Sequence, residues 1–75
     1  MYCYYVMELQ KFSNGEHAHI VHCATDDDPD KARLKGDSVY HQVLAAAAIS
    51  TVAEHGATLL SGQGDPIEHK CYYHA

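Results

Sequence analysis

The feature that most constrains this fold is the middle segment, residues 25 to 56, which predicts one long helix. It opens with Thr25-Asp26-Asp27-Asp28-Pro29, and an aspartate before a proline is typical of an N-cap followed by a first-turn proline. Gly56, just beyond the last apolar residues in helical spacing, predicts where the helix stops. The second half of the segment is apolar on every side, so one partner layer cannot cover it.

Turn and strand signals on both sides of this helix predict two hairpins. Residues 2 to 12 alternate like a half-buried strand, Ser13-Asn14-Gly15 is a turn signal, and residues 17 to 24 predict the second strand. After the helix, residues 57 to 60 and 67 to 73 predict two further strands joined by a Gly- and Pro-containing loop. The sequence therefore predicts a single α+β domain, residues 1 to 75. It has ββαββ order, with a four-stranded, mainly antiparallel sheet packed on one long helix in two layers. The pattern leaves the strand order open.

Helical spacing separates two sides of the middle segment. At about 100° per residue, the side that we assign to the sheet carries Ala32, Gly36, Val39, Tyr40, Val43, Ala47 and Ser50. Gly36 on this side indicates either a close backbone approach or a kink. The opposite side carries His41, Ala45, Ala48, Ile49 and Val52. Because small alanines let two backbones approach closely, we expect Ala45, Ala48, Ile49 and Val52 to form a homodimer interface. The alternative is scattered exposed apolar residues, which are common on protein surfaces.

The composition excludes several classes of protein. The chain has 75 residues, ten acidic and five basic, and a formal net charge of −5. The five cations form no stripe for phosphate contacts, so we expect no nucleic-acid partner. No apolar run approaches the roughly 20 residues of a membrane span, and the N-terminus lacks the pattern of a signal peptide, so we expect no membrane association and a cytoplasmic location. The three cysteines are an odd number, and in an intracellular setting we expect them to be reduced thiols.

Seven histidines are the one unusual feature with chemical content. Strand alternation places His17, His19 and Cys23 on one face of the second strand, and His69 and Cys71 share a face of the last strand. If the sheet brought these faces together, His17 or His19, Cys23, His69 and Cys71 would form a tetrahedral transition-metal site. The spacing lacks the paired knuckles of structural zinc sites, so our first interpretation is that no metal or other cofactor is bound.

No motif predicts catalysis, and we expect a protein that is not an enzyme, with no catalytic residue. Cys23 or Cys71 beside a histidine lacks the context of an activated thiolate. The loop Ser61-Gly62-Gln63-Gly64 has no following helix to bind phosphate. The tyrosines at both ends of the chain either form a recognition surface or only cover the sheet; both interpretations stay open. These are Tyr2, Tyr4, Tyr5, Tyr72 and Tyr73.

Two segments, residues 40 to 50 and the closing Cys71-Tyr72-Tyr73-His74, resemble short uncharacterised proteins encoded in prophages and related integrated elements of bacteria. The resemblance extends loosely over most of the chain and carries no specific activity. It implies an accessory product of a phage or mobile element. We therefore predict a non-enzymatic protein-binding or assembly protein, a homodimer with an unknown protein partner. The alternatives are a transition-metal-binding protein that uses the His17–Cys23 strand and a small acidic inhibitor of a host enzyme.

Overall fold

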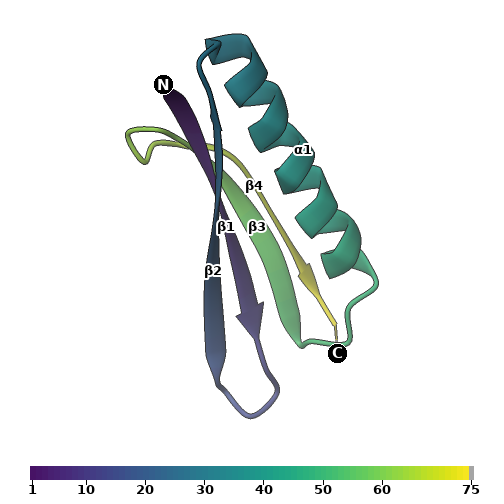
Figure 1. The fold of residues 1–75 in the computed structure, drawn as a ribbon. Helices are drawn as coiled ribbons and strands as arrows, with labels where there is room; N and C mark the ends of the chain where they lie inside the picture. Colours follow the sequence, from purple (N-terminus) through teal and green to yellow (C-terminus); the bar gives the residue numbers. More distant parts are fainter. Residues whose placement is uncertain (75) are drawn as a thin grey trace.

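The computed structural model describes residues 1–74 as one helix packed on one face of a four-stranded antiparallel sheet (Figure 1). The predicted α+β fold of ββαββ order is confirmed. The sheet order is β2-β1-β3-β4, so the two hairpins lie side by side with β1 and β3 in the centre. The elements are β1 (Tyr2–Lys11), β2 (His17–Asp26), α1 (Pro29–Ala48), β3 (Glu54–Ser61) and β4 (Pro66–Tyr73).

A glycine with positive φ stands in each hairpin turn. Gly15 has φ 90° and Gly64 has φ 87°, a region that L side chains rarely adopt. The first turn is closed by the Phe12 N–H, which donates to the Glu16 carbonyl at 2.8 Å. In the second, the Ser61 N–H donates to the Asp65 carbonyl at 2.8 Å. Such turns fix the register of the strands that they join.

The predicted start of the helix is confirmed. Asp28 is the N-cap, and its carboxylate accepts hydrogen bonds from the backbone N–H groups of Asp30 at 2.8 Å and Lys31 at 3.2 Å. Pro29 is the first helical residue, where its missing N–H costs nothing. Asp26, just before the cap, is held by Lys35 from the second turn, with 2.8 Å between Nζ and the carboxylate.

The predicted end of the helix is wrong. The helix ends at Ala48, and His55 and Gly56 belong to β3, opposite Gln10 and Leu9 of β1. The residues after Ala48 favour this early end, because the Ser50 hydroxyl accepts the Val52 N–H at 3.1 Å and so competes with helical bonding. The segment that follows, residues 54–61, pairs with β1 as strand β3. β3 is accordingly longer than the predicted residues 57 to 60.

Gly56 is needed in the sheet for a different reason from the one that the sequence indicated. A Cβ atom there would lie 2.5 Å from the Lys70 carbonyl oxygen and 2.7 Å from Cys71 Cα. The glycine therefore permits a close approach of β4 to β3, and it does not cap the helix.

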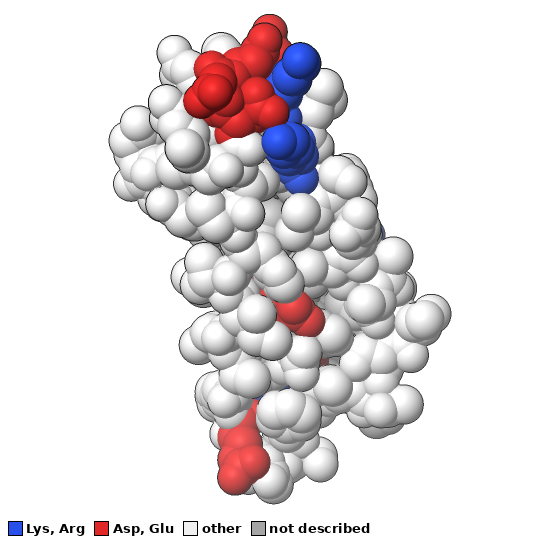
Figure 2. All heavy atoms as spheres, in the orientation of Figure 1, with Lys and Arg blue, Asp and Glu red and all other residues white. Residues whose placement is uncertain are grey.

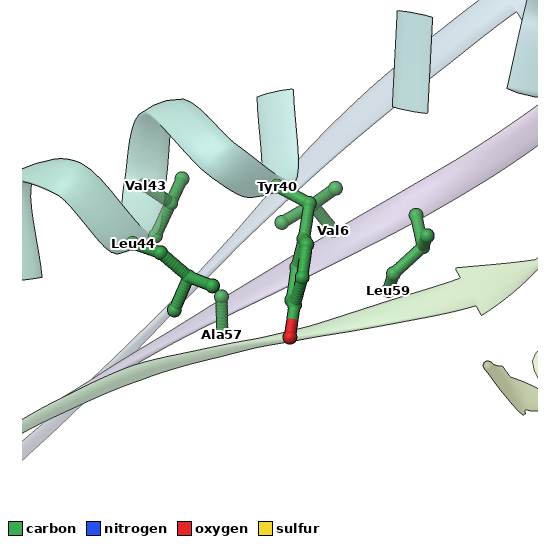
Figure 3. Close-up of a cluster of buried hydrophobic side chains, with 6 residues drawn as sticks. All are labelled: Val6, Tyr40, Val43, Leu44, Ala57 and Leu59. Carbon is green, nitrogen blue, oxygen red and sulfur yellow. The ribbon is translucent and has the colours of Figure 1, made fainter. Parts of the chain in front are cut away.

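The core lies between α1 and the two central strands (Figure 3). The predicted sheet-facing side of the helix is confirmed at Ala32, Gly36, Tyr40, Val43 and Ala47, which are buried, and Leu44 joins them. Gly36 makes the close approach, since a Cβ there would lie 3.0 Å from Tyr4 Cβ. Ser50 lies beyond the helix. The core cluster consists of Val6, Tyr40, Val43, Leu44, Ala57 and Leu59.

The outer side of the helix differs from the prediction at its end. Ala45, Ala48 and Ile49 are exposed, and Ile49 exposes 86% of its surface. Val52 lies in the connection to β3 and is half-buried, so it cannot extend a helical stripe. No helix within residues 1–74 is long and apolar enough to cross a membrane.

Candidate functional site

The face of the sheet opposite α1 is the first candidate surface. Within residues 1–74, no element covers it (Figure 1). Val6 and Leu59 point toward the helix and are buried, so strand alternation directs their neighbours to the other side. We call this side the open face. Its central side chains are Tyr5 and Met7 of β1, Val21 and Cys23 of β2, and Thr58 and Leu60 of β3.

The register arranges the centre of the open face in two rows. Tyr5 lies between Cys23 and Leu60, and Met7 lies between Val21 and Thr58. Met7 exposes 38% of its surface and Val21 exposes 59%. These rows contain no Lys, Arg, Asp or Glu, and the charged pair Lys11 and Glu54 lies at one end of the sheet. The centre of the open face is therefore uncharged and mainly apolar, with Tyr5 and Thr58 as its hydroxyl-bearing residues.

Charge collects elsewhere on the molecule. Figure 2 shows acidic side chains gathered where α1 begins, with basic side chains beside them. Two ion pairs fix this region: Lys35 with Asp26 at 2.8 Å, and Arg33 with Asp37 at 3.2 Å. Because these charges are on the helix side or at the helix start, they do not oppose contact at the open face.

The tyrosines are divided between the two faces. Tyr40 is in the core, and Tyr4 and Tyr72 pack against it from the helix side of the sheet. Tyr5 is on the open face, where its hydroxyl accepts a hydrogen bond from the Cys3 thiol at 3.6 Å. That hydrogen bond is the main reason why the pKa of Tyr5 is raised. One tyrosine thus contributes to the centre of the open face, and others serve the core.

The three cysteines are free thiols. Cys71 is half-buried, and its thiol donates to the Glu54 carboxylate at 3.6 Å. Burial, together with the hydrogen bond to Glu54, raises the pKa of Cys71. A raised pKa keeps the thiol protonated, which is the opposite of what a nucleophilic cysteine requires.

The structure contradicts the four-ligand metal site. His17, His19 and Cys23 are on β2, whereas His69 and Cys71 are on β4, at the opposite edge of the sheet. With β1 and β3 between them, these edges are about 14 Å apart at the usual strand spacing of about 4.8 Å. One ion cannot span that distance. No group of three or more His, Cys, Asp or Glu in residues 1–74 is placed to hold a metal ion.

A polar cluster on the helix side of the sheet was not predicted from the sequence. Glu8 of β1 accepts hydrogen bonds from His55 Nε2 at 2.7 Å, from His22 Nε2 at 3.0 Å and from Gln10 Nε2 at 3.0 Å. His55 is 5% exposed, and His22, on the edge strand β2, is half-buried. The signal in the sequence was a glutamate on the same side of β1 as Val6, a position that requires partners.

The hydrogen bonds of this cluster determine its protonation. An ionised carboxylate only accepts, so the Nε2 atom of each histidine carries the proton. The His55 Nδ1 atom is buried and has no partner among the described residues. Burial disfavours the charged form of Glu8, but the hydrogen bonds from His55, His22 and Gln10 outweigh it and lower the pKa of Glu8.

A groove separates the outer side of α1 from β4. It has a volume of about 650 Å³, and Ala45 and Ala48 line it on the helix side, while Lys70 and Tyr72 line it on the strand side. The Lys70 ammonium lies over the Tyr72 ring, 5.0 Å from its centroid. Two of the predicted interface residues thus lie beside an edge strand.

Comparisons with known protein families, with curated proteins and with solved structures give no match for this chain. The protein is a two-layer α+β protein whose sheet has one uncovered face. That face, the polar cluster and the groove beside β4 are the features from which a function can be inferred.

Proposed function

We propose that the protein is a non-enzymatic assembly protein that forms a homodimer through the open face of its sheet. The observation that carries this proposal is the uncharged apolar centre of that face, around Tyr5, Met7, Val21 and Leu60. Exposed apolar side chains gain free energy when a partner removes them from water, roughly 25 cal/mol per Å². A second copy of the chain is the occupant that we propose.

The size of the open face fits a dimer. Four strands about 4.8 Å apart, each with at least eight residues of about 3.3 Å, outline roughly 500 Å². The accessible area of a surface with side chains exceeds its flat outline. The face therefore approaches the roughly 600 to 1,000 Å² per partner that stable interfaces bury.

The charge distribution also favours a second copy. The protein carries a net charge of −5, so two copies repel each other unless they meet where charge is absent. The central rows of the open face are such a place. Two sheets packed face to face form the sandwich that many proteins use as a core, with about 10 Å between the sheets.

The predicted interface residues on the outer side of the helix are mostly small. Ala45 and Ala48 have only a methyl group to bury, and Ile49 is the one large side chain of the three. We therefore assign the dimer contact to the sheet. The resemblance to prophage-encoded proteins adds the proposed setting, an accessory role in a phage-derived or mobile element.

Sedimentation equilibrium of matched variants tests the proposal. Met7→Glu and Val21→Glu place a carboxylate in the centre of the open face and are expected to remove the face-to-face contact. Ile49→Glu, which adds the same charge to the outer side of the helix, is the control and is expected to leave the mass unchanged. Circular dichroism shows that each variant is folded. If Ile49→Glu dissociates the protein and the two open-face variants do not, the helix is the interface and the proposal fails.

A further inference from the structure

β4 is an edge strand with an unusual charge pattern. It pairs with β3 on one side only, so from Glu68 to Tyr73 the backbone N–H and C=O groups of every second residue point away from the sheet. A bulge interrupts the pairing at Ile67, and Pro66 has no N–H. Glu68 and Lys70 are opposite Leu59 and Ala57, which are buried under the helix, so both charged side chains are on the helix side. His69 between them is on the open-face side.

We propose that β4 pairs with β4 of a second copy as an antiparallel, two-fold symmetric strand pair centred on His69. In this register Glu68 lies directly opposite Lys70 of the partner subunit, and Lys70 lies opposite Glu68 of the partner subunit. Two-fold symmetry forms the ion pair twice. Opposite charges directly across two strands stabilise a sheet, whereas like charges there destabilise it.

The charges select this register over its neighbours. A shift of one strand by two residues, the smallest that keeps the side chains on their faces, places Glu68 against Glu68 of the partner subunit or Lys70 against Lys70 of the partner subunit. A bulge interrupts β4 at Ile67, so the regular part of the strand pair is centred on residues 68–70 of the two copies, where the opposite charges lie.

Glu68 and Lys70 are available for this contact. Both are exposed, and neither makes an ion pair with another residue in the described part of the chain. Lys70 instead lies over the Tyr72 ring, where its charge stays at the edge of the sheet. In the proposed pair, β4 of the second copy lies beside β4, so the strand side of the groove next to α1 would extend onto the second copy.

The other edge of the sheet lacks this feature. From His17 to Thr25, β2 contains no Lys, Arg, Asp or Glu, and Asp26 at its end is held by Lys35. Nothing on β2 selects one register over another. The charge pattern therefore directs pairing to β4.

The β4 contact is separate from the face-to-face contact and does not depend on it. Its two-fold axis is perpendicular to the sheet, whereas that of the face-to-face dimer lies parallel to the sheet. Where both contacts form and the two axes intersect at a right angle, they generate a closed tetramer with D2 symmetry, an arrangement common among oligomers. Either contact alone gives a dimer.

A charge-exchange experiment in the Met7→Glu background tests the edge contact alone. Sedimentation equilibrium is expected to show a dimer for Met7→Glu. Adding Lys70→Glu or Glu68→Lys turns both attractive pairs into repulsive ones and is expected to weaken the dimer about tenfold or more. An equimolar mixture of these two double variants restores both pairs and is expected to form a heterodimer.

Several outcomes overturn the edge contact. They are a Met7→Glu protein that is monomeric, a dimer that Lys70→Glu leaves intact, and a mixture that stays monomeric. Because Glu68 and Lys70 are exposed, the variants are expected to fold, which circular dichroism verifies. The two proposals fail differently. A wild-type dimer that Lys70→Glu dissociates and Met7→Glu does not supports the edge contact alone, and the reverse pattern supports the face-to-face contact alone.

Discussion

Glu8 and His55 form the shortest link between the two central strands on the helix side, with 2.7 Å between His55 Nε2 and Glu8 Oε2. The two residues are 47 positions apart in the sequence. His55 is almost fully buried, and the remaining acceptor capacity of Glu8 is used by His22 and Gln10. A half-buried carboxylate with three donors ties β1, β2 and β3 together at one point.

We predict that Glu8→Gln destabilises the protein by about 1 to 3 kcal/mol, because the amide gives His55 and His22 one neutral acceptor in place of a charged carboxylate. Urea unfolding measured by circular dichroism gives the change in free energy. Glu16→Gln in the exposed first turn is the matched control and is expected to stay within about 0.5 kcal/mol of the wild type. Equal stability of Glu8→Gln and Glu16→Gln would show that the cluster adds nothing.

The same carboxylate predicts a pH dependence. The pKa of Glu8 is lowered from its ordinary value of 4.5, so the folded state favours the ionised form. The stability that this contributes is fully present above that ordinary value and is lost as the pH falls through the lowered pKa. When the pH is lowered below about 4.5, we expect the urea concentration at the midpoint of unfolding to decrease for the wild type. For Glu8→Gln we expect a smaller decrease. Parallel acid profiles for the two proteins would contradict the assignment to Glu8.

Local signals in the sequence were sufficient for the order of the elements. Asp28-Pro29 marks the start of the helix, and Gly15 marks the first turn, because each satisfies a backbone requirement that only a few residue types meet. The end of the helix could not be read in this way. It depends on the pairing of residues 54 to 61 with β1, which is a long-range contact, and Gly56 gave a false stop signal.

The candidate sites depended on the strand order, which no local pattern determines. Alternation correctly placed His17, His19 and Cys23 on one face, but only the order β2-β1-β3-β4 shows that His69 and Cys71 are at the far edge. Glu8, His22 and His55 come from three strands and share no spacing. The charges of Glu68 and Lys70 can be seen in the sequence. They can pair with a second copy only because β4 is an edge strand, which the sequence does not show.

The position of Val43 in the core predicts the effect of the substitution Val43→Asp. Val43 is 8% exposed and packs in the core cluster, so an aspartate there would be a buried charge without a partner. We expect this variant to be unfolded, because such a charge costs several kcal/mol in a domain whose total stability is of the order of 5 kcal/mol. Leu34→Asp, on the exposed side of the same helix, is the control and is expected to fold. A cooperative thermal transition for Val43→Asp would refute the assigned helix face.

The separation of the histidines and cysteines predicts that the purified protein carries no stoichiometric zinc. The β2 and β4 groups lie at opposite edges of the sheet, and His69 is already hydrogen-bonded to the Thr58 hydroxyl at 2.8 Å. Elemental analysis after purification without chelators or metal-affinity resin measures the content. One zinc per chain that is lost in His19→Ala or Cys23→Ser would promote the metal-binding alternative to first place.

The close approach of β3 and β4 at Gly56 predicts the effect of the smallest possible side chain. In Gly56→Ala the new methyl group would lie 2.5 Å from the Lys70 carbonyl oxygen, and that oxygen belongs to the backbone and cannot rotate away. The strands must separate locally, so we expect a loss of about 1 to 3 kcal/mol in the free energy of unfolding. Thr58→Ala, two residues further along β3, removes only an exposed hydrogen bond to His69 and is expected to cost less than about 1 kcal/mol. Urea unfolding of both variants gives the comparison. A Gly56→Ala protein as stable as Thr58→Ala would mean that β4 can move away from β3 at no cost, and β4 would then be too mobile to hold a fixed register with a second copy.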